Sequence, residues 1–113
     1  MTAARAGAPH GAPPLVVESA GDGRAVLVFA GELDAHRVGA LEEALDDPGL
    51  RDATVWELLM RDLTRLDLPC AFALVRAATV RDAPAALHVR GAHRAVRRAL
   101  REAGADAVAT FEG

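Results

Sequence analysis

The sequence is poor in several residue types. It contains one cysteine, no tyrosine and no lysine, and aromatic residues make up 4% of its 113 residues. A single cysteine cannot form an internal disulfide, so a reducing cytoplasm is the simplest compartment. No apolar run approaches the roughly 18 residues of a spanning helix, and the N-terminus lacks the apolar segment of a secretory signal. We therefore expect a cytoplasmic protein that does not cross a membrane.

An excess of positive charge is also missing. The 13 basic residues are outnumbered by 16 acidic ones, and the net charge is −3. Binding of nucleic acid usually needs a basic domain, so we expect no nucleic-acid partner. The histidines do not show the spacing of metal ligands, and no cysteine pair accompanies them; they are His10, His36, His88 and His93. The sequence predicts neither a metal site nor a cofactor.

The residues that are present suffice for one hydrophobic core. Hydrophobic residues make up 51% of the chain and charged residues 26%, which is close to the average of globular domains. The length suits a single domain. Residues 1–13 consist mainly of alanine, glycine and proline and should form a flexible tail. Residues 14–113 should form the domain, with a largely aliphatic core.

Hydrophobic periodicity predicts alternating strands and helices. The segment Gly21-Asp22-Gly23-Arg24 separates two short apolar runs, which is typical of a β-hairpin. Strands that alternate with helices pair in parallel through crossovers. We expect an α/β domain with a mixed four- to five-stranded sheet and helices mainly on one face. The expected strands are 15–20, 25–30, 53–60 and 85–90, with 107–111 as the fifth strand of the larger alternative. The expected helices are 34–46, 69–81 and 92–103.

The stretch from Arg61 to Arg76 is the centre of the pattern. It should leave a buried strand at Met60, cross a short loop and enter a helix. Four residues in it or just beyond it recur at the spacing of one helix face; these are Ala71, Leu74, Val75 and Ala78. Asp67 suits a helix cap and Pro69 the first helical turn.

Three motifs in this order resemble a known family. They are Phe29-Ala30-Gly31-Glu32-Leu33-Asp34, Leu63-Thr64-Arg65-Leu66-Asp67 and Leu87-His88-Val89-Arg90-Gly91. Together they are similar to the STAS domain of bacterial anti-sigma-factor antagonists, and the resemblance covers Leu15 to Phe111. It implies a STAS-like fold, a protein-interaction module in bacterial signalling, and a protein partner such as an anti-sigma factor that is a serine kinase.

The chain departs from the family in the loop that follows Asp67. There the family has a serine, then serine or threonine, and then glycine, and the partner kinase phosphorylates one of these hydroxyls. Here the positions are Leu68, Pro69 and Cys70. Thr64 is the nearby hydroxyl, but it precedes Asp67. We therefore expect no phosphorylation site in this loop.

The candidate partner-binding residues surround the same loop. Asp34 and Asp67 both follow strands and should lie at the carboxyl edge of the sheet, where α/β proteins commonly bind; helix capping alone also accounts for both. Phe72 should point outward with Arg76 and could anchor a partner, or it could fold over the sheet edge. The predicted set is Asp34, Asp67, Leu68, Pro69, Cys70, Phe72 and Arg76.

Two other functions compete with protein binding. A helix start can lower the pKa of a thiol, so Cys70 could serve a Cys/His enzyme, but the sequence offers no base and Cys70 fits better as a small residue at a crowded helix start. We expect no enzyme. A small-ligand or nucleotide-sensing STAS module is the alternative, because helix N-termini attract anions. The absence of a glycine-rich phosphate loop counts against it.

Charge is distributed unevenly between the first and last helices. The last helix carries Arg94, Arg97, Arg98 and Arg101 on the side opposite its apolar face, and the first carries Asp34, Glu42, Glu43, Asp46 and Asp47. Such faces are usually solvated. Docking of the arginines to an acidic surface, or a homodimer through complementary helices, are the alternatives.

Overall fold

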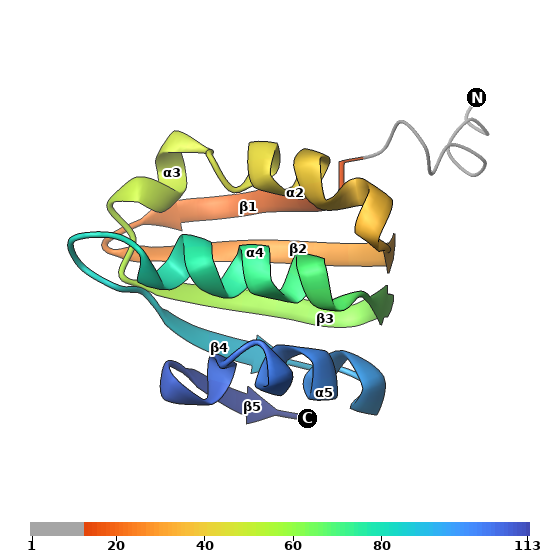
Figure 1. Cartoon of the computed structure of the whole chain (residues 1–113). Helices are drawn as coiled ribbons and strands as arrows, with labels where there is room; N and C mark the ends of the chain where they lie inside the picture. Colours follow the sequence, from red (N-terminus) through yellow and green to blue (C-terminus); the bar gives the residue numbers. More distant parts are fainter. Residues whose placement is uncertain (1–12) are drawn as a thin grey trace.

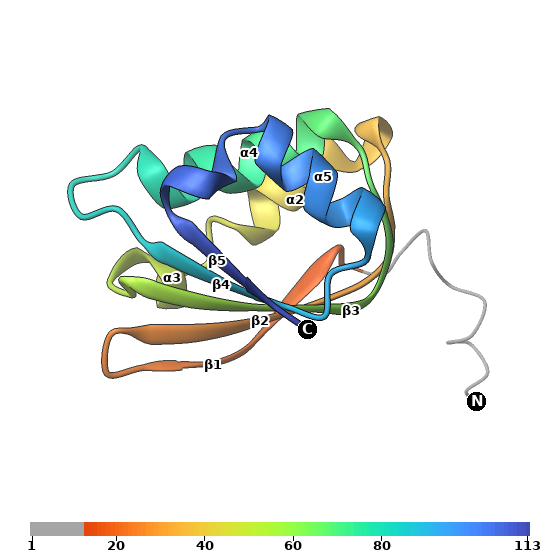
Figure 2. The same cartoon turned by 90° about the horizontal axis from the view of Figure 1, so that it is seen from below.

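The computed structural model describes residues 13–113 as two layers, a sheet and a set of helices on one of its faces (Figures 1 and 2). The sheet has five strands in the order β1-β2-β3-β4-β5. β1 is antiparallel to β2, and the other neighbours are parallel. The elements are β1 (Leu15–Gly21), β2 (Arg24–Leu33), η1 (Ala35–Arg37), α2 (Val38–Ala44), α3 (Pro48–Arg51), β3 (Val55–Leu66), α4 (Leu68–Thr79), β4 (Ala86–Arg90), α5 (Arg94–Glu102), η2 (Ala105–Ala107) and β5 (Ala109–Glu112). The predicted mixed sheet is confirmed.

The hairpin between β1 and β2 follows from its turn residues. Gly21 pairs with Arg24, so Asp22 and Gly23 form a two-residue loop. Both have positive φ, 55° at Asp22 and 79° at Gly23. This is the conformation that tight hairpins require, and the Asp-Gly pair adopts it readily.

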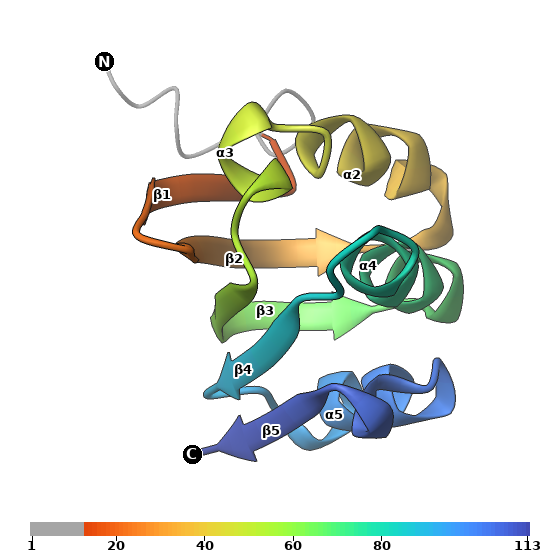
Figure 3. The same cartoon turned by 90° about the vertical axis from the view of Figure 1, so that its left-hand side faces the viewer.

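The core lies between the two layers and is mainly aliphatic. Alternate residues of β2 and β3 point toward the helices, among them Leu27 and Leu58, which are fully buried. The apolar faces predicted for the helices are the buried faces. They are represented by Leu41 of α2, Leu74 of α4 and Val96 of α5. Figure 3 shows α4 between α2 and α5 in the helical layer.

The prediction that the strand ends at Met60 and is followed directly by a loop is wrong. β3 continues through this stretch and pairs with the end of β2, from Ala30 opposite Asp62 to Leu33 opposite Leu66. The sequence pattern did not show this part of the strand, because exposed polar residues interrupt its apolar run; they are Arg61, Asp62, Thr64 and Arg65. Parallel pairing with β2 satisfies the backbone regardless of these side chains.

The predicted first helix is divided in the structure. It begins as the 3-10 turn η1, continues as α2, and is followed by the one-turn helix α3. Pro48 ends the expected helix, but it also begins α3, because the Asp47 carboxylate accepts a hydrogen bond from the Gly49 amide at 2.7 Å. Proline is well suited to this first helical position.

Two further expectations concern the N-terminal tail and the absence of a membrane-spanning helix. Most of the predicted flexible tail, residues 1–12, lies outside the described part of the chain. Within residues 13–113, no helix is long and apolar enough to cross a bilayer.

Candidate protein-binding site

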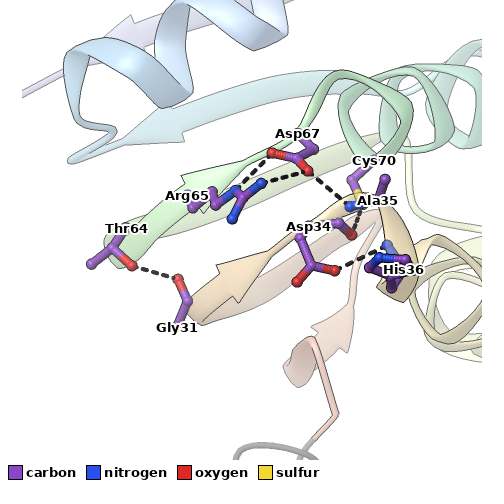
Figure 4. A network of polar contacts seen from close by, with 8 residues as sticks. All are labelled: Gly31, Asp34, Ala35, His36, Thr64, Arg65, Asp67 and Cys70. Carbon is purple, nitrogen blue, oxygen red and sulfur yellow. Dashed lines mark hydrogen bonds and ion pairs between the residues drawn. The ribbon is translucent and has the colours of Figure 1, made fainter.

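The candidate site lies where β2 and β3 end side by side. Their last paired residues are Leu33 and Leu66, so the next residues, Asp34 and Asp67, leave the same edge of the sheet. Each begins a helical segment, η1 and α4 respectively. The structure thus brings the two predicted aspartates to neighbouring positions (Figure 4).

The two aspartates have different roles. Asp34 caps its own helix as predicted, since its Oδ1 accepts a hydrogen bond from the His36 amide at 2.9 Å. Asp67 occupies the N-cap position of α4, but its carboxylate makes no capping bond there. Its Oδ2 instead accepts a hydrogen bond from the Ala35 amide of η1 at 2.9 Å. The predicted cap is therefore wrong for the Asp67 side chain, because a donor on the neighbouring helix start is available.

Arg65 completes this contact, and the sequence-based site did not include it. Its Nε donates to Asp67 Oδ1 at 2.8 Å and its Nη2 donates to Asp67 Oδ2 at 3.1 Å. The spacing of Arg65 and Asp67 could have predicted this contact, because residues i and i+2 of a strand point to the same side. The Arg65 hydrogen bonds, assisted by the Ala35 amide, lower the pKa of the Asp67 carboxyl. Asp67 in turn raises the pKa of Arg65.

Thr64 also links the two strands. Its Oγ1 donates a hydrogen bond to the Gly31 carbonyl oxygen at 3.0 Å. Gly31 has a φ of 83°, in the left-handed region that favours glycine. The Thr64 hydroxyl therefore helps to hold the ends of β2 and β3 together (Figure 4).

Cys70 lies beneath this edge and is completely buried. Its Sγ donates a hydrogen bond to the Asp34 carbonyl oxygen at 3.2 Å. Burial, followed by the nearby charges of Asp67 and Asp34, raises the pKa of the thiol to about 11. Its inclusion among partner-contacting residues is wrong, because no part of it is accessible. It packs α4 against η1 as a neutral thiol, the structural role weighed above.

The remaining predicted residues lie on the outer surface at the start of α4. Phe72 is 50% exposed and Leu68 is 37% exposed, and Pro69 and Arg76 are exposed as well. Of the two alternatives for Phe72, the outward one agrees with this exposure. Apolar side chains on a helix surface beside a fixed polar edge can bind another protein surface.

Comparison with known proteins agrees with the fold. A family model described as "Mlab, STAS domain" matches residues 5–110. An anti-sigma factor antagonist from Mycobacterium paratuberculosis superposes with a TM-score of 0.67 and 19% identity, over 87% of this chain and 83% of that one. Phosphorylated SpoIIAA, a cell fate determinant of Bacillus, superposes with a TM-score of 0.60 and 14% identity, over 86% and 89%. Unphosphorylated SpoIIAA gives a TM-score of 0.57 and 16% identity, over 86% of each chain.

No curated protein sequence matches the chain significantly. The family model nevertheless spans most of it, and the solved structures share its fold. The chain therefore belongs to the STAS family, in the group described as "Mlab, STAS domain".

Proposed function

We propose that this protein is a non-catalytic protein-binding module of bacterial signalling, and that its partner in the cytoplasm is an anti-sigma factor. The structural neighbours named as anti-sigma factor antagonists support this choice of partner. The contact surface is the outer side of the α4 start together with the edge formed by Asp34 and Asp67. The observation that carries the proposal is the exposed aromatic ring of Phe72 one turn into α4.

The edge is suited to recognition because it is held in one conformation. Asp67 joins β3 to η1 through Arg65 and Ala35, and Cys70 joins α4 to η1 from below. A partner that binds such a preorganised surface loses less conformational entropy than one that must order a loop. Leu68, Phe72 and Arg76 then offer apolar contacts and a guanidinium on one helix face.

Binding should not be controlled by phosphorylation of the loop after Asp67. Leu68, Pro69 and Cys70 offer no side-chain hydroxyl. Thr64, the nearest upstream hydroxyl, donates to Gly31 within the joined strands. A partner would therefore meet the same surface at all times, and regulation would have to act by another route.

Replacing Phe72 by alanine tests the proposed surface. The F72A variant should bind a cognate anti-sigma factor more weakly by about 1 to 3 kcal/mol, as expected for truncation of a buried anchor. Its own stability should change little, because half of the ring is already exposed. Isothermal titration calorimetry and thermal unfolding measure the two quantities.

Leu74→Ala is the matched control for this test. Leu74 is fully buried on the other side of α4, so its truncation should cost about 2 to 5 kcal/mol of folding free energy. An F72A variant that unfolds but keeps its affinity when folded would place Phe72 in the core and move the recognition surface elsewhere.

A further inference from the structure

The helical layer carries opposite charges on its two sides. α2 lies on one side, α5 on the other and α4 between them (Figures 1 and 3). The exposed acidic residues on and just after α2 are Glu42, Glu43 and Asp46, and α2 itself contains no basic residue. The exposed arginines of α5 are Arg94, Arg98 and Arg101. One side of the layer is therefore acidic and the other basic.

Much of this charge is not neutralised within the domain. Among residues 13–113, Glu43 and Asp46 form no side-chain ion pair or hydrogen bond, and neither do Arg94 and Arg98. Arg101 differs, because it lies 3.4 Å from Asp106 and stacks over the Phe111 ring. Arg94 and Arg98 are four residues apart on α5 and therefore project from one side of that helix. Asp46 follows Glu43 by three residues and lies just past the end of α2.

Apolar groups lie between the charged sides. Phe72 on α4 is 50% exposed, and Val80 at its C-terminal end is 74% exposed. Arg76 is the charged residue between them on the outer side of α4. Apart from Arg76 the centre is therefore apolar and charged residues surround it, which is the usual composition of a protein interface.

We propose that two copies of this chain associate through their helical layers, with α2 of each copy against α5 of the other. All three helices run in the same direction, antiparallel to β2, β3 and β4 (Figure 1). A two-fold axis parallel to the helices places acidic α2 opposite basic α5 twice, whereas an axis across the helices opposes like charges. A two-fold contact of this kind is self-complementary and closes at the dimer.

The choice of a second copy rests on this charge complementarity. α2 has seven residues and α5 has nine, so two helical segments of about two turns each can lie along one another. The association does not depend on an anti-sigma factor, and its test uses the chain alone. It covers Phe72 and Arg76, so a second copy and a partner on the α4 surface exclude each other.

Charge reversal with complementation tests the association. The two variants are R94E/R98E and E43R/D46R, and sedimentation equilibrium at low ionic strength measures the dimer. The wild type should dimerise, and added salt should weaken the dimer because exposed charges are screened. Each variant alone should dimerise about tenfold more weakly or worse, because like charges then face each other. An equimolar mixture of the two should form a heterodimer, since both helix contacts are again opposite in charge.

The variants and their control separate association from folding. R94E places a carboxylate in the first turn of α5, and D46R places a guanidinium just past the end of α2. Both changes agree with the helix dipole. Circular dichroism should therefore show folded proteins. R51E reverses an exposed arginine on α3, outside the two helices, and should dimerise like the wild type.

Three results would overturn the proposal. One is a wild type that stays monomeric at low ionic strength; binding of that monomer to vesicles containing phosphatidylserine through Arg94 and Arg98 would assign the basic side to a different anionic partner. Another is a dimer that both double variants retain. The third is an equimolar mixture of the two variants that fails to form the heterodimer.

Discussion

Asp67 stabilises two chain segments with one carboxylate. Its bonds to Arg65 fix the end of β3, and its bond to the Ala35 amide fixes η1. A backbone amide at a helix start otherwise lacks a partner within its helix. The motif that resembles the STAS family therefore has a structural reason in this chain, independent of any phosphorylated residue after it.

The Asp67→Asn substitution should make the free energy of unfolding less dependent on pH in the acidic range. The folded pKa of Asp67 is lowered, so its contribution is present above the ordinary carboxyl pKa and is lost as the pH falls through the folded value. The D67N variant should be less stable than the wild type at neutral pH, and the difference should shrink as the pH falls below the ordinary carboxyl pKa of 3.8. Urea unfolding at several pH values measures this. D62N alters an exposed aspartate of the same strand and should show no such convergence; equal pH profiles for all three proteins would contradict the role of Asp67.

Cys70 should behave as a buried, neutral thiol. Native protein should react slowly with a thiol reagent and should react fast after unfolding, because the side chain is inaccessible and its pKa is raised from 9.0 to about 11. Because the pKa is higher in the folded protein, the thiol of the unfolded protein ionises at a lower pH than the thiol of the folded protein. Its contribution to stability is therefore complete below pH 9.0 and is lost as the pH rises to about 11.

The matched variant for this prediction is Cys70→Ala. It should lack the part of the alkaline destabilisation that comes from the thiol, although the lost packing lowers its stability at every pH. Fast modification of the native protein at neutral pH would show that the thiol is accessible and reopen the question of a reactive cysteine.

At the scale of elements, the periodic segments were predictable and the polar strand end was not. The i, i+3, i+4 pattern of Ala71, Leu74 and Val75 located the buried face of α4 correctly. The extension of β3 beyond Met60 was missed, because its side chains are mostly polar and its pairing with β2 is a long-range contact. Local sequence patterns contain little information on such pairing.

The candidate site was likewise predictable from the sequence only in part. The sequence located Asp34, Asp67 and Phe72 through their positions after strands or on a helix side. It could not show that the Asp67 carboxylate would bond to Ala35, since that depends on how η1 and α4 meet. Nor could it show that Cys70 would be covered, because burial at a helix start depends on the neighbouring segment.

At the scale of the whole molecule, one core joins both layers. Buried residues of β1, β2, β3 and β4 and of the covering helices form a continuous cluster, with Ala109 and Phe111 of β5 partly buried against it. The single tryptophan, Trp56, lies in this cluster with 1% exposure. Arg81 of the connection after α4 lies 5.6 Å from the centre of its ring and donates to the Arg51 carbonyl of α3. The fluorescence of Trp56 therefore reports on the packing of β3, α3 and the end of α4 together.

Unfolding of the monomer should consequently be a single transition. Trp56 fluorescence and far-ultraviolet circular dichroism should give the same urea midpoint, with a slope of about 1 to 3 kcal/mol per molar urea. If the chain dimerises through its helical layer, both midpoints should rise together with protein concentration, because association stabilises the folded state by mass action. In E43R/D46R the concentration dependence should move to protein concentrations about tenfold higher or more, while the two probes still agree. A fluorescence transition that precedes the dichroism transition would instead show that the region around Trp56 unfolds separately from the rest of the sheet.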